Sequence, residues 1–342
     1  MPGRETHRVR LRDVAARAGV SPTTASFVLG GRDMRISEET RQRVLRTARE
    51  LDYRPNLTAR SLRTQQSSTI GLVADTIATG HYGGELIRGS LMAALQHGHG
   101  LLVCESEGDP DLEAALIDGL IDRQVMGLIV ATSSHDLVPA PRGTGGLPVV
   151  LLNCRSDGPA PSIVPDEEAG GRDAAALLLA AGHTDRIWMV GETPERSLPG
   201  VGRRAGVTAR LAEAGVHLEA EISCPWWPEG AFDVMSQVLA EGRRPGAVIC
   251  LNDRIALGVS QALAVAGLAV PTDVSLVSFD DSELAAWMRP ALSSIALPER
   301  EMGRLAVESL LCPEPPPSLR LVPMPVRVRD SVGPPAVITP RR

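Results

Sequence analysis

Apolar positions near the N-terminus repeat at intervals of three and four residues, the spacing of one face of a helix. The first stripe consists of Leu11, Val14, Ala15 and Ala18. Gly19 permits the left-handed turn that ends a helix, Ser21 is a good N-cap, and Pro22 fits a first helical position. The inward face of the second helix is then Ala25, Val28 and Leu29. Two short helices joined by Gly-Val-Ser predict a helix-turn-helix, whose second helix enters the major groove of DNA.

A third helix is predicted after Ser37, which caps it, with Glu38 and Glu39 at its positive end. Its buried stripe is Val44, Leu45, Ala48 and Leu51, and its outer face carries Arg41, Arg43, Arg46 and Arg49. The run "NLTARSLRTQQSST" that follows Pro55 is polar, weakly amphipathic and too short to be a stable helix alone in water. An interdomain linker is one interpretation of this run.

From Ser68 onward, apolar runs alternate with helical patterns, which predicts parallel sheets with right-handed crossovers. The first strand runs are "TIGLVA", "LLVCES", "MGLIVAT" and "LPVVLLN". After "SIVPDEEAGG" the alternation starts again with "RIWMVG", "EISCPW", "AVICLN" and "VSLVSFD". The predicted fold class is a small all-α helix-turn-helix headpiece plus an α/β body of two Rossmann-like lobes of similar size.

The charge of the chain also differs between the predicted headpiece and the predicted body. All 35 basic residues are arginines, and residues 1–64 hold fourteen of them beside seven acids, a net charge of +7. The remaining residues carry −13. A small basic segment on a large acidic one is typical of a module that binds a polyanion, although a merely solvated charged face is the simpler alternative.

Cysteine usage and hydropathy indicate a compartment. Five cysteines lie far apart without a C-x-x-C pair, which argues against a disulfide framework or a structural zinc site and favours buried apolar roles in a reducing cytoplasm. No signal segment and no apolar span of about 18–20 residues appears, so a cytoplasmic, nucleoid-associated protein is expected. No bound metal or cofactor is expected either.

The motifs of the headpiece together resemble one family. "LRDVAARAGVS" with "T.S.VL", then "ISEETRQRVLRTARELDYRPN" and "ARSL", look like the headpiece of the lactose/galactose repressor (LacI/GalR) family over residues 9–64. The resemblance implies a regulator that binds a near-palindromic DNA operator as a homodimer, and that is switched by a small effector. It implies a headpiece over 1–55 and a hinge segment over 56–67 that becomes helical on DNA, where Leu62 wedges between base pairs in the minor groove.

The DNA-binding residues that the pattern and the resemblance predict are Ser21, Pro22, Thr23, Thr24, Ser26, Phe27, Arg35, Ser37, Asn56, Ala59 and Leu62. Two of them depart from the family. Phe27 stands where a hydrogen-bonding side chain is usual, and it can at best touch a thymine methyl. Pro22 occupies a second base-reading position. The operator sequence therefore does not carry over from relatives.

The body resembles periplasmic sugar-binding proteins. The resemblance implies a first lobe over 68–164 and about 295–322, a second lobe over 165–294 and about 323–332, and a flexible tail over 333–342. Crossovers are expected at about residue 164, near Ala291–Ser294 and over Leu321–Val326. Ligands of open α/β sheets bind outside the carboxyl ends of the strands, here the cleft between the lobes.

Polar residues at predicted strand ends are the effector-binding candidates: Asp75, His81, Tyr82, Asn153, Arg203, Trp226, Asn252 and Asp280. Arg203, Asn252 and Asp280 match the family's sugar-binding pattern. Trp226 and Trp227 supply an aromatic surface for a sugar face, and one of the pair is expected to serve packing. Any single one of the polar residues is commonly a helix cap or turn residue instead.

Two other functions compete with a sugar-responsive regulator. "GVGRRAG" contains G-x-G-x-x-A, but "ETPERSLP" separates it from the strand "RIWMVG", so an NAD-dependent enzyme is disfavoured. The chain contains no lysine, which excludes G-K-[ST] phosphate loops and Schiff-base chemistry. A nucleotide-like or protein corepressor remains open as the partner of the body.

Overall fold

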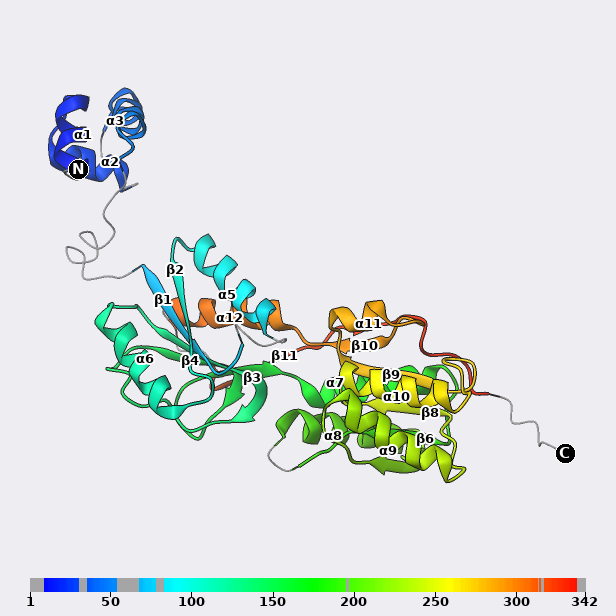
Figure 1. Cartoon of the computed structure of the whole chain (residues 1–342). Helices are drawn as coiled ribbons and strands as arrows, with labels where there is room; N and C mark the ends of the chain where they lie inside the picture. Colours follow the sequence, from blue (N-terminus) through cyan, green and yellow to red (C-terminus); the bar gives the residue numbers. More distant parts are fainter. Residues whose placement is uncertain are drawn as a thin grey trace, which may run out of the picture. The chain divides into compact units, whose positions relative to one another are not determined.

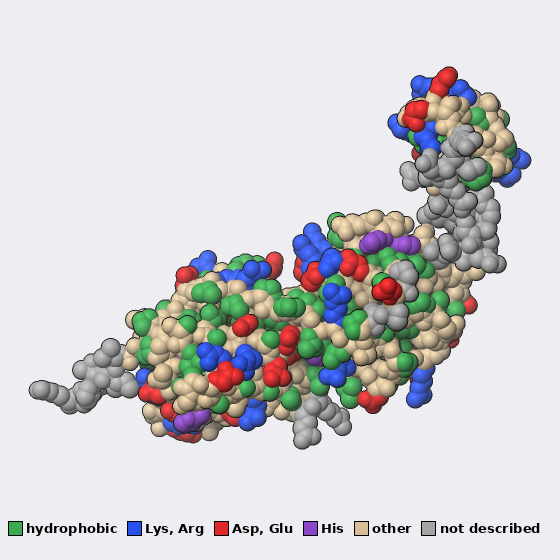
Figure 2. Space-filling view, turned by 180° about the vertical axis from the view of Figure 1, so that it is seen from behind, with side chains coloured by type: hydrophobic (Ala, Val, Ile, Leu, Met, Phe, Trp, Pro, Cys, Tyr) green, Lys and Arg blue, Asp and Glu red, His purple; other side chains and the backbone are tan. Residues whose placement is uncertain are grey.

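The protein forms two compact units, residues 1–68 and residues 69–342, described separately. The computed structural model describes residues 9–30, 36–53, 68–77, 83–194, 197–312, 314 and 317–336. The predicted fold class is confirmed: a helical headpiece and an α/β body of two parallel-sheet lobes. Figure 1 traces both units in sequence colours, and Figure 2 shows them from behind with the side chains coloured by type.

The headpiece contains three helices, α1 (Leu11–Ala18), α2 (Pro22–Leu29) and α3 (Glu38–Glu50). Gly19 ends α1 in the left-handed conformation at φ 65°, which costs a residue without a side chain nothing. A small core joins all three helices and consists of Val14, Ala15, Ala18, Ala25, Val28, Val44 and Ala48. The three helices and their caps are therefore where the apolar pattern predicts them.

The first lobe is built on a sheet with the strand order β11-β5-β4-β3-β1-β2. Its strands are β1 (Thr69–Ala74), β2 (Gly100–Glu105), β3 (Leu128–Leu137), β4 (Val149–Arg155), β5 (Ser162–Pro165) and β11 (Leu319–Val322). Its helices are α5 (Gly84–Gln96), α6 (Pro110–Asp122) and α12 (Glu299–Leu311). In Figure 1, α5 and α12 lie together on one face of the sheet and α6 lies on the other. Successive strand residues therefore enter two different cores, Leu72 that of α5 and α12, and Val73 that of α6.

The second lobe repeats this plan with the order β12-β10-β9-β8-β6-β7. Its strands are β6 (Ile187–Val190), β7 (Ala220–Ile222), β8 (Ala247–Cys250), β9 (Ser275–Asp280), β10 (Ser293–Ala296) and β12 (Val326–Arg327). Its helices are α7 (Glu167–Ala180), α8 (Leu198–Glu213), α9 (Pro228–Ala240), α10 (Asp253–Val265) and the short α11 (Glu283–Trp287). Helices α7 and α8 pack as one pair, and α9 and α10 as another. The strands β6, β8 and β10 are fully buried and β9 is buried except at Asp280, so these four strands supply the centre of the core.

The chain passes between the two sheets three times, after β5, after β10, and between β11 and β12. The expected crossover near Ala291–Ser294 was placed too early, because β10 pairs with β9 in the second sheet as far as Ala296. The predicted tail also begins too early. The carbonyl of Gly333 is hydrogen-bonded to Ser275 and His183, and its N–H donates to the Ser275 hydroxyl. These bonds fix the backbone of Gly333, because backbone polar groups need partners.

Candidate DNA-binding surface and effector cleft

The turn between α1 and α2 fixes the start of the candidate recognition helix. The Ser21 hydroxyl accepts a hydrogen bond from the backbone N–H of Thr24 at 3.0 Å, so the predicted N-cap forms. Pro22 and Thr23 are exposed behind this cap, whereas Thr24, Ser26 and Phe27 are half-buried. The first turn of α2 therefore presents its side chains to solvent, and Phe27 lies partly against the headpiece.

Helix α3 supports the same turn from the other side. Ser37 caps it by accepting from Thr40 N–H at 3.3 Å. Arg43, expected on an outer face, instead donates from Nε to the carbonyl of Ala18 at 3.0 Å and so occupies the end of α1. The remaining DNA candidates, Arg35, Asn56, Ala59 and Leu62, lie outside the described residues, as does the predicted hinge segment.

A buried charge network occupies the second lobe. The guanidinium of Arg203 on α8 is only 2 % exposed. Its Nε donates to Glu167 Oε2 at 2.7 Å and its Nη1 lies 3.4 Å from Asp280 Oδ1. The carbonyl of Leu251 accepts a further bond from Nη1. These partners keep the group charged against the cost of burial and raise its pKa, because a buried guanidinium is stable only when paired and hydrogen-bonded.

Burial shifts the pKa values of the carboxyl groups in opposite directions. Burial alone raises the pKa of Glu167, but Arg203 and His135 outweigh it and hold this pKa below its ordinary value. For Asp280, burial dominates over Arg203 and raises the pKa to about 7. Burial also raises the pKa of Asp253, whose carboxylate accepts bonds from Ser282 and Ser294 at 2.7–2.9 Å. Arg203 thus holds one carboxylate firmly and the other weakly.

Two more effector candidates join this network. Trp226 lies 5.5 Å from the guanidinium carbon of Arg203, and Phe279 lies on it at 4.6 Å. The Asn252 amide donates to the Trp226 carbonyl at 3.5 Å, while its oxygen caps α10 by accepting from Ile255 N–H at 2.7 Å. The structure therefore brings Arg203, Trp226, Asn252 and Asp280 together, and Asn252 is also the helix cap that a strand-end asparagine commonly is. Trp227, by contrast, is 55 % exposed.

The first-lobe candidates lie on neighbouring strands. The carboxylate of Asp75, after β1, accepts bonds from the backbone N–H and the hydroxyl of Ser133 at 2.9–3.0 Å. Asn153 on β4 is buried at φ 59° and donates to the carbonyl of Thr132 at 3.0 Å. Both hold a bulge in β3, where the pairing with β4 shifts between Ala131 and Asp136. His81 and Tyr82 lie outside the described residues.

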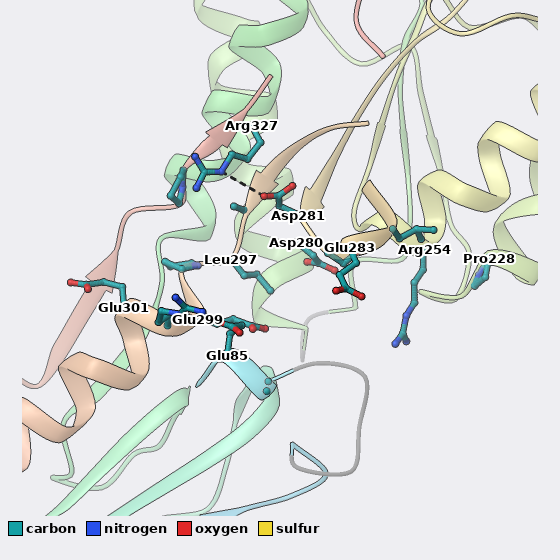
Figure 3. Close-up of a pocket in the computed structure, with 18 of the residues that line it drawn as sticks. Glu85, Pro228, Arg254, Asp280, Asp281, Glu283, Leu297, Glu299, Glu301 and Arg327 are labelled. Carbon is teal, nitrogen blue, oxygen red and sulfur yellow. Dashed lines mark hydrogen bonds and ion pairs between the residues drawn. The ribbon is translucent and has the colours of Figure 1, made fainter. Parts of the chain in front are cut away.

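A pocket of about 880 Å³ opens between the lobes, and Figure 3 shows side chains of its wall. It lies between the start of α5, the segment after β9, and the crossover from β10 into α12. Of the predicted effector residues, Asp280 lines it. Seven carboxylates and three guanidiniums line the wall: Glu85, Glu229, Asp280, Asp281, Glu283, Glu299, Glu301, Arg254, Arg300 and Arg327. Burial and Glu85 raise the pKa of Glu299, which lies beside Glu85 in Figure 3.

Two buried residues near the lobe junction were not predicted. Glu167, the first residue of α7, is the principal partner of Arg203, and His135 in the β3 bulge lies 3.9 Å from it. The acidic run "PDEEAGG" directly after a short apolar strand was the available signal for Glu167. His135 had none, because its burial depends on a bulge that the strand pattern does not reveal.

The hydropathy of the helices and the state of the cysteines are also visible in the structure. The described part of the chain has no helix that is both long and apolar enough to span a bilayer. All five cysteines are free, and Cys154, Cys224 and Cys250 are buried as expected. Cys312 is exposed and Cys104 is half-buried, so the prediction of a buried apolar role was wrong for these two.

Comparison with known proteins decides the family. Residues 10–56 match the model of bacterial regulatory proteins of the lacI family, and residues 164–332 match that of a periplasmic binding protein-like domain. The ribose operon repressor of Escherichia coli K12 is 34% identical over 308 residues, which cover 88% of this chain and 92% of the relative. The chain belongs to the LacI family.

Two further similarities place this LacI-family protein more closely. The transcriptional repressor PurR of Erwinia tasmaniensis is 33% identical, over 88% of this chain and 89% of its own length. A crystal structure of the lac repressor dimer bound to operator and the anti-inducer ONPF superposes with a TM-score of 0.76 at 27% identity, over 95% of this chain and 99% of that one. The LacI-family headpiece and both lobes are thus present in one chain, as in a DNA-binding regulator with a small-molecule effector.

Proposed function

We propose that this protein is a transcriptional repressor that binds a near-palindromic operator as a homodimer and responds to a small effector between its lobes. The capped turn that presents the first turn of α2 carries the DNA-binding part of this proposal. Pro22, Thr23 and Thr24 lie at the N-terminal end of α2, the end that reads base edges in helix-turn-helix proteins. Since the relatives are repressors, we infer a regulator without catalytic activity, at work on the nucleoid.

Genome-wide DNA capture with the whole protein tests operator binding. We expect a small set of sites with two half-sites, because a dimer reads both. Thr23→Glu, which adds a carboxylate next to DNA phosphates, should lower the affinity for such a site about 100-fold in a band-shift titration. Glu50→Gln on α3 is the charge-changing control. Equal affinity of Thr23→Glu and the unaltered protein would refute this DNA-binding surface.

A homodimer requires an interface, and the first lobe exposes a candidate surface for it. Helix α5 and the edge strand β2 carry exposed apolar side chains: Leu91, Met92, Leu95, Leu102 and Val103. Exposed apolar side chains on a helix and a strand that contact each other are typical of an interface. Met92→Glu should therefore convert the dimer to a monomer in sedimentation experiments. Val265→Glu on α10, which replaces a side chain that is 78 % exposed, is the control and should leave the dimer intact.

For the effector, a sugar fits better than a phosphate-bearing ligand. The guanidinium of Arg203 is already bonded to Glu167, Asp280 and a carbonyl, and the pocket wall carries more carboxylates than guanidiniums. Like charge repels a phosphate, whereas the hydroxyls of a neutral sugar can use both carboxylate oxygens and amide donors. Asp75, Asn153, Asn252, Asp280 and Trp226 are the residues that we propose to bind it.

Isothermal titration with sugar, purine and nucleotide panels separates the candidate effectors. Ribose belongs in the sugar panel because the ribose operon repressor is a relative, and purines belong beside it because PurR is another. Absence of sugar binding at millimolar concentration would overturn the sugar proposal. Since effector and operator must change each other's affinity by the same factor, a band shift with the bound ligand then measures the switch and its sign.

A further inference from the structure

His135 lies unpaired in the interior of the body. It is 7 % exposed, and neither ring nitrogen has a hydrogen-bond partner. Among the buried side chains that the structure describes, it alone lacks a partner on both ring nitrogens. An unsatisfied buried donor or acceptor costs about 1–3 kcal/mol, so native proteins rarely keep one without a purpose.

A carboxylate of the other lobe lies close to this ring. His135 Nδ1 is 3.9 Å from Glu167 Oε1, and β3, which carries His135, contacts α8 of the second lobe. A hydrogen bond between nitrogen and oxygen requires about 2.9 Å, so the pair is short of one by about 1 Å.

His135 is fixed to the first lobe through its neighbours in the bulge. The Thr132 hydroxyl donates to the Asn153 carbonyl at 2.9 Å, and the Asn153 amide returns a bond to Thr132. Ser133 is held by Asp75 through its N–H and its hydroxyl. These bonds tie the bulge to β1 and β4, so the His135 backbone moves with the first sheet.

Glu167 in turn is fixed to the second lobe. Arg203 donates to both of its carboxylate oxygens, at 2.7 and 3.4 Å. A side chain on Gly202 would come within 2.7 Å of the Glu167 Cβ, so α8 packs tightly against the start of α7. The distance between His135 and Glu167 therefore reports the relative orientation of the lobes.

We propose that His135 and Glu167 form a contact between the two lobes that selects one of their relative orientations. The contact joins the first-lobe bulge directly to the Arg203 network. A small rotation about the three crossings brings Nδ1 of the imidazole within hydrogen-bond distance of Glu167 Oε1 and gives this nitrogen a partner. The contact is a property of the protein without effector, so it holds or fails independently of the proposed sugar.

Distances between spin labels on the two lobes test this contact in the whole protein without ligand. Labels at Ala115→Cys on α6 and Gln237→Cys on α9 are both exposed. The background carries Cys104→Ser and Cys312→Ser, while the buried thiols of Cys154, Cys224 and Cys250 do not react. Dilution into unlabelled protein restricts the measured distances to one chain.

The two lobe orientations give two interlobe distances, and we expect each of His135→Phe and Glu167→Gln to change the ratio of their populations in the same direction. The expected change is about fivefold, which corresponds to the loss of one net hydrogen bond. His183→Gln is the matched control, because His183 is a buried histidine bonded to Ser275 inside the second lobe. It should retain the original distribution. If either His135→Phe or folded Glu167→Gln gives the original distribution, the proposed contact is wrong. Should His135→Phe fail to fold, Glu167→Gln alone decides.

Discussion

The two lobes share one strand order but differ in how their cleft side is held. In the second lobe, Arg203 and its carboxylates form a buried charged network, and Asp253 is surrounded by serine hydroxyls. In the first lobe, neutral hydroxyls, amides and backbone groups bind Asp75 and Asn153. The outer strands differ too, since β11 is parallel to β5 whereas β12 is antiparallel to β10.

This difference indicates that the two lobes contribute to an effector site in different ways although their folds are similar. Charged groups that satisfy each other in a dry interior are costly to rearrange, because removal of one leaves another unpaired. The second lobe therefore offers an effector a site that is already rigid. The first lobe relies on weaker bonds at its bulge, so it is the side on which the arrangement around a ligand can be changed at smaller cost.

Removal of the central charge should have the largest effect. Arg203→Met leaves Glu167 and Asp280 buried without their cation, and the free energy of unfolding in denaturant should fall by about 3–5 kcal/mol. The neighbouring Arg204 provides the control, since its bond to Glu221 is largely exposed and Arg204→Met should cost less than about 1 kcal/mol. Similar losses for both variants would contradict a special role for the buried network.

Helix contacts should be equally sensitive in both lobes. A methyl group at Gly206 would lie 1.9 Å from the carbonyl oxygen of Glu168, and one at Gly89 would lie 2.0 Å from that of Arg300. Gly206→Ala and Gly89→Ala should therefore each lower the unfolding free energy by about 3 kcal/mol. Gly119→Ala on α6 meets only a flexible arginine tip and should be neutral or stabilising. A tolerant Gly89→Ala would show that the first lobe packs more loosely than the second.

The charged lobe should also respond to pH. Burial raises the pKa of Asp280 from 3.8 to about 7, so the folded state holds this proton more tightly than the unfolded state. The resulting stabilisation is complete at low pH and is lost as pH rises toward 7. Between pH 5 and 8, the unaltered protein should lose about 2 kcal/mol relative to Asp280→Asn in thermal or chemical unfolding. Parallel pH profiles for the two proteins would argue against a raised pKa.

The smallest effect is expected at the bulge of the first lobe. Ser133→Ala removes one hydroxyl bond to Asp75 but keeps the backbone bond, so a loss of about 1 kcal/mol is expected in denaturant unfolding. Ser134→Ala, at the neighbouring exposed residue that is bonded to Asp136, should cost less. If Ser133→Ala matched Arg203→Met in cost, the contrast between the lobes would disappear.

The apolar pattern was enough to predict most of the fold. Headpiece helices and caps were predictable because Ser21, Gly19 and Ser37 act on their own neighbours. The helix α12 was not predicted as an element. The short strands β5 and β10 were not predicted either, because four-residue apolar runs have no distinct period. Their places depend on tertiary pairing, which is also why the second crossover was set too early.

Site residues were predictable where a motif or a strand end identified the residue by itself. They were not predictable where contacts with distant elements determine whether the residue is buried. Arg203 and Asp280 were recognisable by motif and strand-end position, and they do meet. Glu167 was missed because an acidic helix start is ordinarily a solvated first turn, and only the approach of α8 buries it. His135 was missed because it lies buried where the register between β3 and β4 shifts by three residues, which the strand pattern does not reveal.

The three crossings impose an order on biosynthesis. Helix α12 covers the core of the first lobe, and β11 closes the edge of its sheet, yet both follow nearly the whole second lobe along the chain. A ribosome therefore releases the first lobe with an open apolar face and completes it only after Val322 has emerged. Such late, long-range pairing slows folding, and the partly made chain is the form most exposed to aggregation and chaperone capture.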